Sequence, residues 1–234
     1  MSVLAALRHP VFSIVFTIFC YAVALALHRR WRWIPPIVAA CVPIVALLLA
    51  ARIPYADYNR GGNLLTWWLG PATVALAVPM YRNGRRLKRS LPRLLLVVFA
   101  GAVVGMTTAG ATAWLLGAPI AVAMSAVPKS VTTPIAVEVA RELGGIPQIT
   151  VALVILAGVL GATFGPAILA IFRVREDRSV GVAIGSASHG IGTASLVRRS
   201  ELQSAVSSWA MAASGVVTSL LAAALALLLR HAKL

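Results

Sequence analysis

The sequence predicts an all-α, polytopic integral membrane protein with about six to eight transmembrane elements. Three observations predict this class. Of the 234 residues, 60% are hydrophobic and only 12% are charged, and the mean hydropathy is +0.90. A soluble domain of this length could not bury so much apolar surface in one core. The apolar residues also form long runs, each close to the roughly 17 to 25 residues that a helix needs to cross a bilayer.

These runs follow one another with short connections, at 10–27, 34–51, 64–80, 94–116, 149–172 and 204–229. Two further stretches, about 120–140 and 180–197, are apolar but interrupted by Pro, Gly and hydroxyl residues. The connection at 52–62 is the longest in the first half, and we expect Asp57 there to be a solvated loop carboxylate. Since no soluble domain or long linker is apparent, we expect a single membrane domain over 1–234.

The net charge of +15 does not indicate nucleic-acid binding, because the arginines lie in short connections between apolar runs. The richest connections are 28–33, 82–93 and 173–178. The positive-inside rule and contact with anionic headgroups of the lipid bilayer explain this pattern. We therefore expect 82–93, the most basic loop, on the cytoplasmic side.

Two topologies are open for the interrupted stretches. If both cross the membrane, 28–33, 82–93 and 198–203 share the cytoplasmic side and the loop around Arg173 lies outside. If both are re-entrant hairpins, the Arg173 loop moves inside and the charge bias becomes stronger. The positive-inside rule favours the hairpins, but the sequence leaves both topologies open.

A faint internal repeat suggests a two-fold design. Residues 70–82 can be laid over 185–198, since each begins with Gly and small residues, ends at a basic loop and precedes a long apolar span. Chance similarity between Ala- and Gly-rich segments is the alternative. Transporters built from two repeats hold their sites at the repeat interface.

The first interrupted stretch contains two prolines, Pro128 and Pro134, which predict a helix break from about Val127 to Thr133. Pro134 suits the first turn of a new half-helix with Thr132 or Thr133 as N-cap. The free N–H groups at such an N-terminus favour an anion such as a carboxylate.

Charged and hydroxyl side chains accompany this break. Lys129 would add a full positive charge, and Ser130, Thr132 and Thr133 would add hydroxyls. Glu138 could pair with Lys129, take up a coupled proton or mark the membrane surface. The alternative for Lys129 is that it lies at shallow depth and extends to the surface.

The second interrupted stretch contains three glycines, Gly185, Gly190 and Gly192, which would break the helix and allow close approach of a ligand. Ser188 and Thr193 are the candidate hydroxyl ligands of this stretch, with Ser186 and Ser195 nearby. His189 could carry a proton near neutral pH, or it could be a structural hydrogen-bonding residue.

Packing and catalysis are the alternatives to a solute pathway. Small residues four apart, at Gly101/Gly105, Gly161/Gly165 and Gly181/Gly185, usually indicate close helix packing. We expect no enzyme, because no pair of carboxylates lies within an apolar run and no His-x-x-x-His or Gly-x-Ser-x-Gly motif occurs. A Ser nucleophile next to Lys129 or His189 is the catalytic alternative, but sequence neighbours do not make a catalytic geometry. The spacing of Cys and His predicts no metal and no cofactor.

Four motifs resemble the signatures of the LrgB/CidB family, which includes the plastid glycolate/glycerate translocator. They are LGPATVALAVPMY at 69–81, PKSVTTPIA at 128–136, FGP at 164–166 and ASHGIGTA at 187–194. The resemblance runs from about Tyr55 to the C-terminus, with Met80 where Leu is common. It implies a multi-pass protein of the bacterial inner membrane, often paired with a small holin-like LrgA/CidA partner. Bacterial members are labelled antiholin-like or regulators of murein hydrolase export, whereas the plant relative moves 2-hydroxy carboxylates.

Together, the residues and the resemblance predict a transporter of small monocarboxylates, of the glycolate, glycerate, lactate or pyruvate type. The alternative is an antiholin-like regulator that acts with the holin-like partner. For the transporter we expect a homodimer. Its substrate would be held by Lys129, Ser130, Thr132, Thr133, Ser188, His189, Gly190 and Thr193, with Gly70 and Thr73 as a wall. His189, with Glu138, would couple protons.

Overall fold

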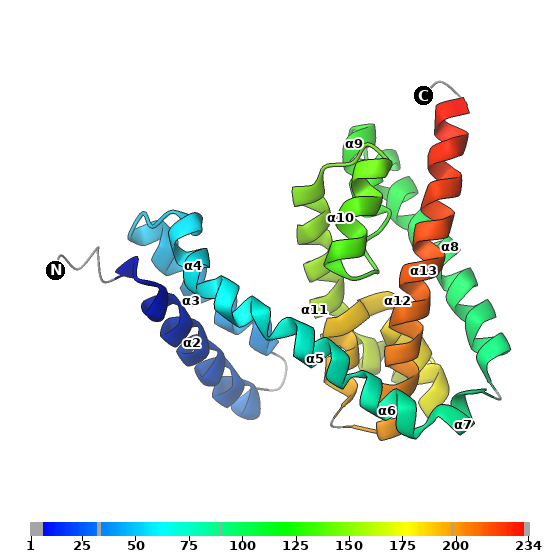
Figure 1. The fold of residues 1–234 in the computed structure, drawn as a ribbon, viewed down its shortest axis with the longest axis horizontal. Coiled ribbons are helices and arrows are strands. Elements are labelled where there is room, and N and C mark those ends of the chain that lie inside the picture. Colours follow the sequence, from blue (N-terminus) through cyan, green and yellow to red (C-terminus); the bar gives the residue numbers. More distant parts are fainter. Residues whose placement is uncertain (1–6, 32–33, 89, 198, 232–234) are drawn as a thin grey trace. The chain divides into compact units, whose positions relative to one another are not determined.

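The computed structural model describes residues 7–31, 34–88, 90–197 and 199–231, and these ranges contain helices and no strand (Figure 1). The predicted all-α class is confirmed. The chain forms two compact units, Met1–Ala75 and Leu76–Leu234, which we describe separately. Within the described residues, five helical stretches are long and apolar enough to span a membrane: Pro10–Arg30, Tyr55–Arg82, Leu91–Leu115, Pro147–Ile171 and Glu201–Leu229. The second of them consists of three consecutive shorter helices, Tyr55–Trp67, Leu69–Ala75 and Ala77–Arg82. The protein is therefore a multi-pass membrane protein.

The first unit is built around helix α2. Its helices are α2 (Pro10–Arg30), α3 (Pro36–Ala50), α4 (Tyr55–Trp67) and α5 (Leu69–Ala75). Helix α2 packs against both α3 and α4. The Thr17 hydroxyl of α2 lies 2.7 Å from the Tyr58 hydroxyl of α4, and Gly61 lets α4 approach the main chain at Pro10.

Asp57 is not in a loop, so that expectation is wrong. Helix α4 begins at Tyr55, and Asp57 lies in its first turn, where a carboxylate interacts favourably with the helix dipole. The Asp57 carboxylate is 3.7 Å from the Arg8 side chain and 3.7 Å from that of Arg60. The polar residues that indicated a connection instead form the start of a helix.

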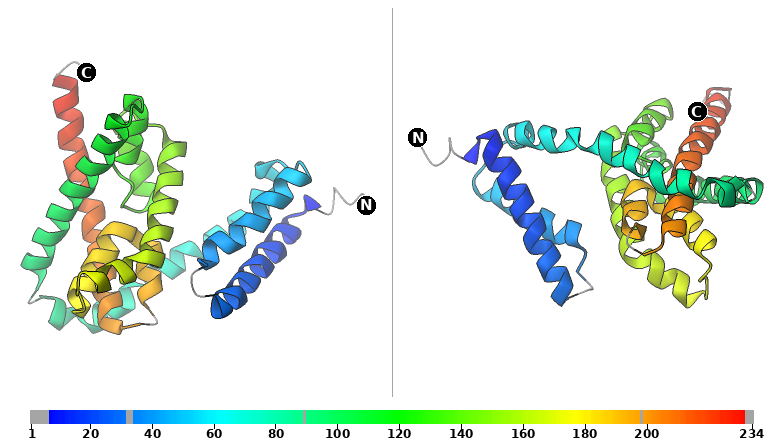
Figure 2. Two further views of the ribbon diagram at one scale, coloured as in Figure 1. Left: turned by 180° about the vertical axis from the view of Figure 1, so that it is seen from behind. Right: turned by 60° about the horizontal axis from the view of Figure 1, so that its bottom comes forward.

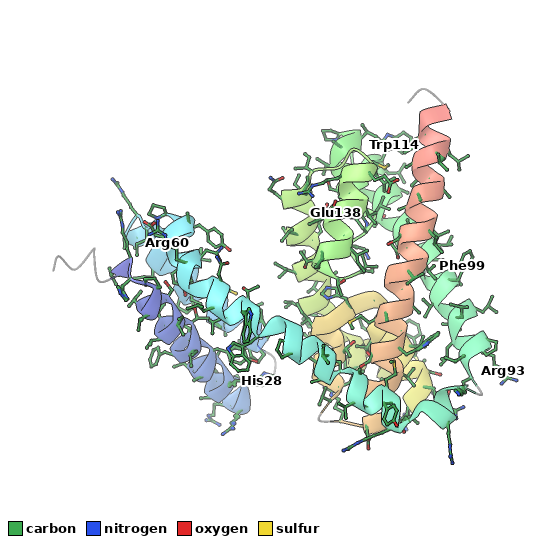
Figure 3. The ribbon with its side chains drawn as sticks, in the orientation of Figure 1. His28, Arg60, Arg93, Phe99, Trp114 and Glu138 are labelled. Atoms are coloured by element: carbon green, nitrogen blue, oxygen red, sulfur yellow. The ribbon has the colours of Figure 1, made fainter. Side chains whose placement is uncertain are left out.

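The second unit contains three long helices with shorter helices between them. In chain order they are α6 (Ala77–Arg82), α7 (Gly84–Lys88), α8 (Leu91–Leu115), α9 (Ile120–Ala126), α10 (Thr133–Glu142), α11 (Pro147–Ile171), α12 (Asp177–Leu196) and α13 (Glu201–His231). We call the end of this unit with α9, α10 and the last turns of α13 the upper end (Figure 1), and the end with α6 and α7 the lower end. Figure 3 shows Trp114 and Arg93 at the upper and lower ends of α8.

Helices α9 and α10 form a hairpin that enters from the upper end. From Val127, beside Gly110 of α8, the chain descends to Ser130, beside Gly105 in the middle of α8. It then returns along α13, where Val139 and Leu143 belong to one apolar cluster with Ala222 and Ala226. The return is closed at Ser125, whose hydroxyl accepts a hydrogen bond from the Ile146 amide at 2.7 Å.

Helix α12 doubles back as well, and it enters from the lower end (Figure 2). It ascends along α11 to His189, which has the non-helical dihedrals φ 39° and ψ −135°. After His189 the chain descends, so that Gly192 lies against Ile184 and Ser188. At the base, Leu196 packs in one cluster with Val180 and Ile184.

The two hairpins therefore have the same arrangement in opposite directions. Each follows a long helix, α8 or α11, and each folds back against it. This similarity between the two hairpins is not the repeat that we expected between 70–82 and 185–198. Residues 70–82 include α5 of the first unit and α6 of the second, whereas 185–198 begins inside a hairpin.

Candidate solute site at two hairpin tips

The tip of the first hairpin is the non-helical segment between Ala126 and Thr133. Two turns shape it, with the Lys129 amide donating to the Ala126 carbonyl at 3.2 Å and the Val131 amide donating to the Pro128 carbonyl at 3.3 Å. Thr132 is the N-cap of α10, but its side chain makes no capping hydrogen bond. The positive end of a half-helix therefore lies at this tip with its N-cap hydroxyl unused for capping.

Lys129 is half-buried at this tip, and its ammonium donates a hydrogen bond to the Ser130 hydroxyl at 3.2 Å. The ion pairs among the described residues involve Asp57 and Glu138, and Lys129 takes part in none of them. Glu138 pairs with Arg141 at 2.6 Å and is exposed on α10 (Figure 3). Of the three alternatives for Glu138, the pair with Lys129 is not the one that forms, because Glu138 pairs with Arg141 one turn away on α10.

His189 forms the tip of the second hairpin and is only 5% exposed. Its Nε2 lies 2.9 Å from the carbonyl oxygen of Val154 on α11. A carbonyl oxygen only accepts hydrogen bonds, so Nε2 carries the proton and donates it in this bond. The dihedrals of His189 lie in a region that glycine adopts far more readily than other residues, which makes this tip a strained turn.

Glycines on α11 explain how the second hairpin approaches so closely. Gly158, Gly161 and Gly165 face His189, Ser188 and Ile184 in turn, and a Cβ at any of the three would clash with its neighbour. On the other side of α12, Gly181 and Gly185 face α13 in the same way. Small residues four apart thus serve helix packing here, as the alternative interpretation expected.

The break in α12 is at His189 and not at Gly185, Gly190 or Gly192, where the sequence predicted it. The positive φ of this hairpin belongs to His189, and the glycines with positive φ among the described residues are Gly117 and Gly144. Gly185 and Gly192 provide room for Ser207 and Ser188. The sequence signal came from glycine composition, whereas tertiary packing puts the turn on the residue between the glycines.

The candidate hydroxyl ligands of the second hairpin are largely engaged in packing. Thr193 is fully buried; its hydroxyl donates to the His189 carbonyl at 2.8 Å and lies 2.8 Å from the Ser207 hydroxyl of α13. Ser188 is buried against Gly161. Of the residues predicted here, Gly190 is the more open, since a Cβ at that position would meet only Met211, at 3.8 Å.

The two tips meet at one residue of α11. The Val131 side chain, from the first tip, packs in one cluster with that of Val154, and His189, from the second tip, binds the Val154 carbonyl. The structure therefore brings the segments carrying Lys129 and His189 to the same level of α11. Gly70 and Thr73 lie in α5 of the first unit, and their role as a wall stays a prediction.

A small cavity lies beside the first tip. Its volume of about 10 Å³ is no larger than one water molecule needs, and its lining includes Gly101, Gly105, Ser130, Ser214 and Thr218. The sequence interpretation missed the two α13 residues. Their signal was the recurrence of hydroxyls at 207, 214 and 218, spacings of seven and four that put them on one helix face.

Within the described ranges, no group of three or more His, Cys, Asp or Glu residues is arranged to hold a metal ion. The polar groups at the tips are instead an ammonium, an imidazole and hydroxyls. Such groups donate hydrogen bonds to anions and form hydrogen bonds with hydroxyl groups.

Comparison with known proteins identifies the family. The model of the LrgB-like family matches residues 17–228. An uncharacterized protein of Haemophilus influenzae is 35% identical, covering 88% of this chain and 90% of the relative. YwbG of Bacillus subtilis is 34% identical, covering 88% and 92%. The antiholin-like protein LrgB of Bacillus mycoides is 30% identical, covering 92% and 95%.

No solved structure matches the chain. The family match runs through both compact units and includes the two hairpins and the long helices that support them. The chain belongs to the LrgB-like family, as its motifs predicted.

Proposed function

We propose that this protein carries small monocarboxylates of the glycolate, glycerate, lactate or pyruvate type across the bacterial inner membrane. The observation that carries the proposal is the meeting of two opposed hairpin tips at Val154, one bearing Lys129 and the other His189. Non-helical backbone and ionisable side chains at membrane depth are tolerated where they line a site, and they are costly elsewhere. Helix packing alone requires neither.

The carboxylate would bind at the first tip. Lys129 supplies the charge, and the N-terminus of α10 supplies free N–H groups and the positive end of its dipole. Ser130, Thr132 and Thr133 would hold the remaining oxygens. Ser188 and Gly190 would contact the solute from the second tip, whereas Thr193 would act by keeping that tip on α13.

His189 is the candidate for proton coupling. Its Nε2 proton is used in the bond to Val154, which leaves Nδ1 as the nitrogen that would gain and lose a proton during transport. Glu138 takes second place, because it is exposed and already paired with Arg141.

The charge distribution supports a cytoplasmic lower end. With both hairpins re-entrant, the basic residues of α6, α7, the start of α8 and the α11–α12 connection share that end; they include Arg82, Arg85, Lys88, Arg93, Arg173, Arg175 and Arg178. This arrangement follows the positive-inside rule.

Uptake of labelled glycolate, lactate and pyruvate into proteoliposomes containing this chain alone tests the proposal, with and without an inward proton gradient. We expect saturable uptake that Lys129→Ala abolishes, and dependence on the gradient that His189→Ala removes. Size-exclusion profiles of the purified variants separate loss of transport from loss of folding. Saturable uptake that is unchanged in Lys129→Ala would contradict the proposed site.

A second candidate function is favoured by the names of relatives. Several Bacillus proteins that are 30% identical over 218 residues are named antiholin-like protein LrgB. On this proposal the chain would regulate murein hydrolase export or lysis together with a small LrgA/CidA-type partner. It would then show no flux alone, and only non-selective leakage with the partner present.

A further inference from the structure

Hydrogen bonds tie the hairpin α9–α10 of the second unit to α11. At its base, the Ser125 hydroxyl accepts a hydrogen bond from the Ile146 amide at 2.7 Å, and the Thr150 hydroxyl donates to the Ser125 carbonyl at 3.0 Å. At its tip, Val131 packs with Val154 in one apolar cluster. These contacts hold the three helices together, and we call α9, α10 and α11 the first body.

The second hairpin is tied in the same way to α13, and we call α12 and α13 the second body. The Asp177 carboxylate at the start of α12 accepts hydrogen bonds from the Ser200 hydroxyl at 2.9 Å and from the Gln203 side-chain amide at 2.8 Å. Closer to the tip, the Thr193 hydroxyl lies 2.8 Å from the Ser207 hydroxyl of α13. The second hairpin is therefore bonded to α13 both at its base and near its tip.

The boundary between the two bodies has a different character. Within the described residues, a single hydrogen bond joins residues 120–171 to residues 177–226. It runs from the Nε2 of His189 to the Val154 carbonyl. Elsewhere on this boundary, three glycines of α11 face α12, and apolar side chains of α10 pack against alanines of α13. The polar contacts thus lie within the bodies, whereas the boundary is almost entirely apolar.

This distribution decides which parts of the unit can move together. In the hydrocarbon core no water replaces a hydrogen bond that breaks, so the bonded contacts inside each body resist separation. Apolar surfaces lose less when they part, because lipid tails are as apolar as the side chains they replace. Helix α8 contacts both bodies through apolar clusters. The movement of lowest cost therefore runs along the boundary and breaks one hydrogen bond.

We propose that α12 and α13 move as one body against α9, α10 and α11 during transport, and that the bond between His189 and Val154 is the contact that breaks. This inference rests on the proposed function and adds how its site opens. Lys129 lies on the first body and His189 on the second, so the movement changes the separation between the two halves of the candidate site. One position brings the halves together around the solute, and the other parts them to release it.

A pair of cysteines across the boundary tests the movement in the full chain, with Cys20→Ser and Cys41→Ser as background. The pair is Gly165→Cys with Ile184→Cys, since a Cβ at Gly165 would lie 4.0 Å from the Ile184 Cγ1. The experiment measures uptake of labelled glycolate, lactate and pyruvate into proteoliposomes before treatment with a membrane-permeant, reducible bifunctional thiol reagent, after it, and after reduction. We expect cross-linking to abolish uptake and reduction to restore it, because a bridged boundary cannot shift.

The matched control pair lies inside the second body. Asp177→Cys with Ser200→Cys puts the same bridge where a hydrogen bond of 2.9 Å now holds the two positions together. Cross-linking of this pair should leave its uptake at the rate measured before treatment, because both positions move together. Each single-cysteine variant, treated with the same reagent, shows the effect of modification without a bridge.

A second pair across the boundary provides the test if the first pair does not react. A Cβ at Gly215 of α13 would lie 2.8 Å from the Cδ1 of Ile135 on α10. Ile135 also lines a groove of about 360 Å³, through which the reagent can reach it. Cross-linking of Ile135→Cys with Gly215→Cys should therefore cause the same reversible loss of uptake.

The outcomes separate this inference from the function beneath it. Full uptake by protein cross-linked across the boundary would overturn the movement and leave the carrier intact. Loss of uptake on cross-linking the control pair would overturn the assignment of α12 and α13 to one body. Uptake of no carboxylate by folded wild-type protein would overturn the proposed function, and the movement with it.

Discussion

The imidazole of His189 donates a hydrogen bond to the main-chain carbonyl of Val154, with 2.9 Å between Nε2 and the oxygen. The side chain of the same Val154 packs against Val131 of the other hairpin. One residue of α11 therefore contacts both tips. A shift of either hairpin along α11 would therefore change its own contact with Val154, the residue that the other hairpin also contacts.

The strained backbone at His189 predicts an unusual order of stability among variants. His189→Ala loses the hydrogen bond and keeps a side chain at φ 39°, whereas His189→Gly loses the bond but relieves the strain. We expect the glycine variant to be more stable than the alanine variant by about 1 kcal/mol. Denaturant unfolding of the purified variants measures the difference, and equal stabilities would show that the turn is unstrained.

Gly161 and Gly101 provide a matched pair of substitutions inside 25-residue helices. A Cβ at Gly161 would overlap the Ser188 side chain, whereas one at Gly101 would meet open space. We expect Gly161→Ala to destabilise the protein by about 1–3 kcal/mol through overpacking. Gly101→Ala should be neutral or stabilising by up to about 1 kcal/mol. Thermal unfolding compares them, and a stable Gly161→Ala would contradict close packing of α12 on α11.

Ser125 closes the base of the first hairpin. Its buried hydroxyl donates to the Ala121 carbonyl at 2.6 Å and accepts from the Ile146 amide at 2.7 Å. Ser125→Ala would leave the Ile146 amide without this partner, at a cost of about 1–3 kcal/mol. Ser219→Ala, whose hydroxyl bonds only within its own turn, is the control. Comparable unfolding midpoints for the two variants would show that Ser125 does not hold the hairpin closed.

Re-entrant hairpins predict which loops can be labelled from outside the cell. In a background with Cys20→Ser and Cys41→Ser, we expect a membrane-impermeant maleimide to label Glu142→Cys in intact cells. Arg175→Cys should react only after permeabilisation, as should Arg85→Cys, the cytoplasmic reference. Hairpins that cross the membrane completely would give the opposite result at Glu142 and Arg175, with the reference unchanged.

Much of the candidate site was visible in the sequence because its chemistry is local. Pro128 and Pro134 both lack the N–H donor of a continuous helix and lie only six residues apart, and the helix is interrupted between Ala126 and Thr133. A lysine and a histidine in apolar stretches likewise stand out from composition alone. The sequence did not indicate the position of Ser214 and Thr218, because hydroxyls on a membrane helix can bond within their own turn wherever the helix lies. Only the packing of α13 beside the first tip shows that these two line the small cavity there.

By itself, the sequence determined the membrane class, the long helices, the family and the break at Pro128–Pro134, because these depend on hydropathy, proline chemistry and short motifs. Tertiary structure decided that the interrupted stretches fold back from opposite ends, that the strained turn is at His189, and that α13 completes the cavity. These features arise from contacts between residues far apart in the chain. The contact between a glycine and a side chain of another helix, such as that between Gly161 and Ser188, sets how closely the two helices approach. The local sequence around a glycine does not specify which side chain it will face.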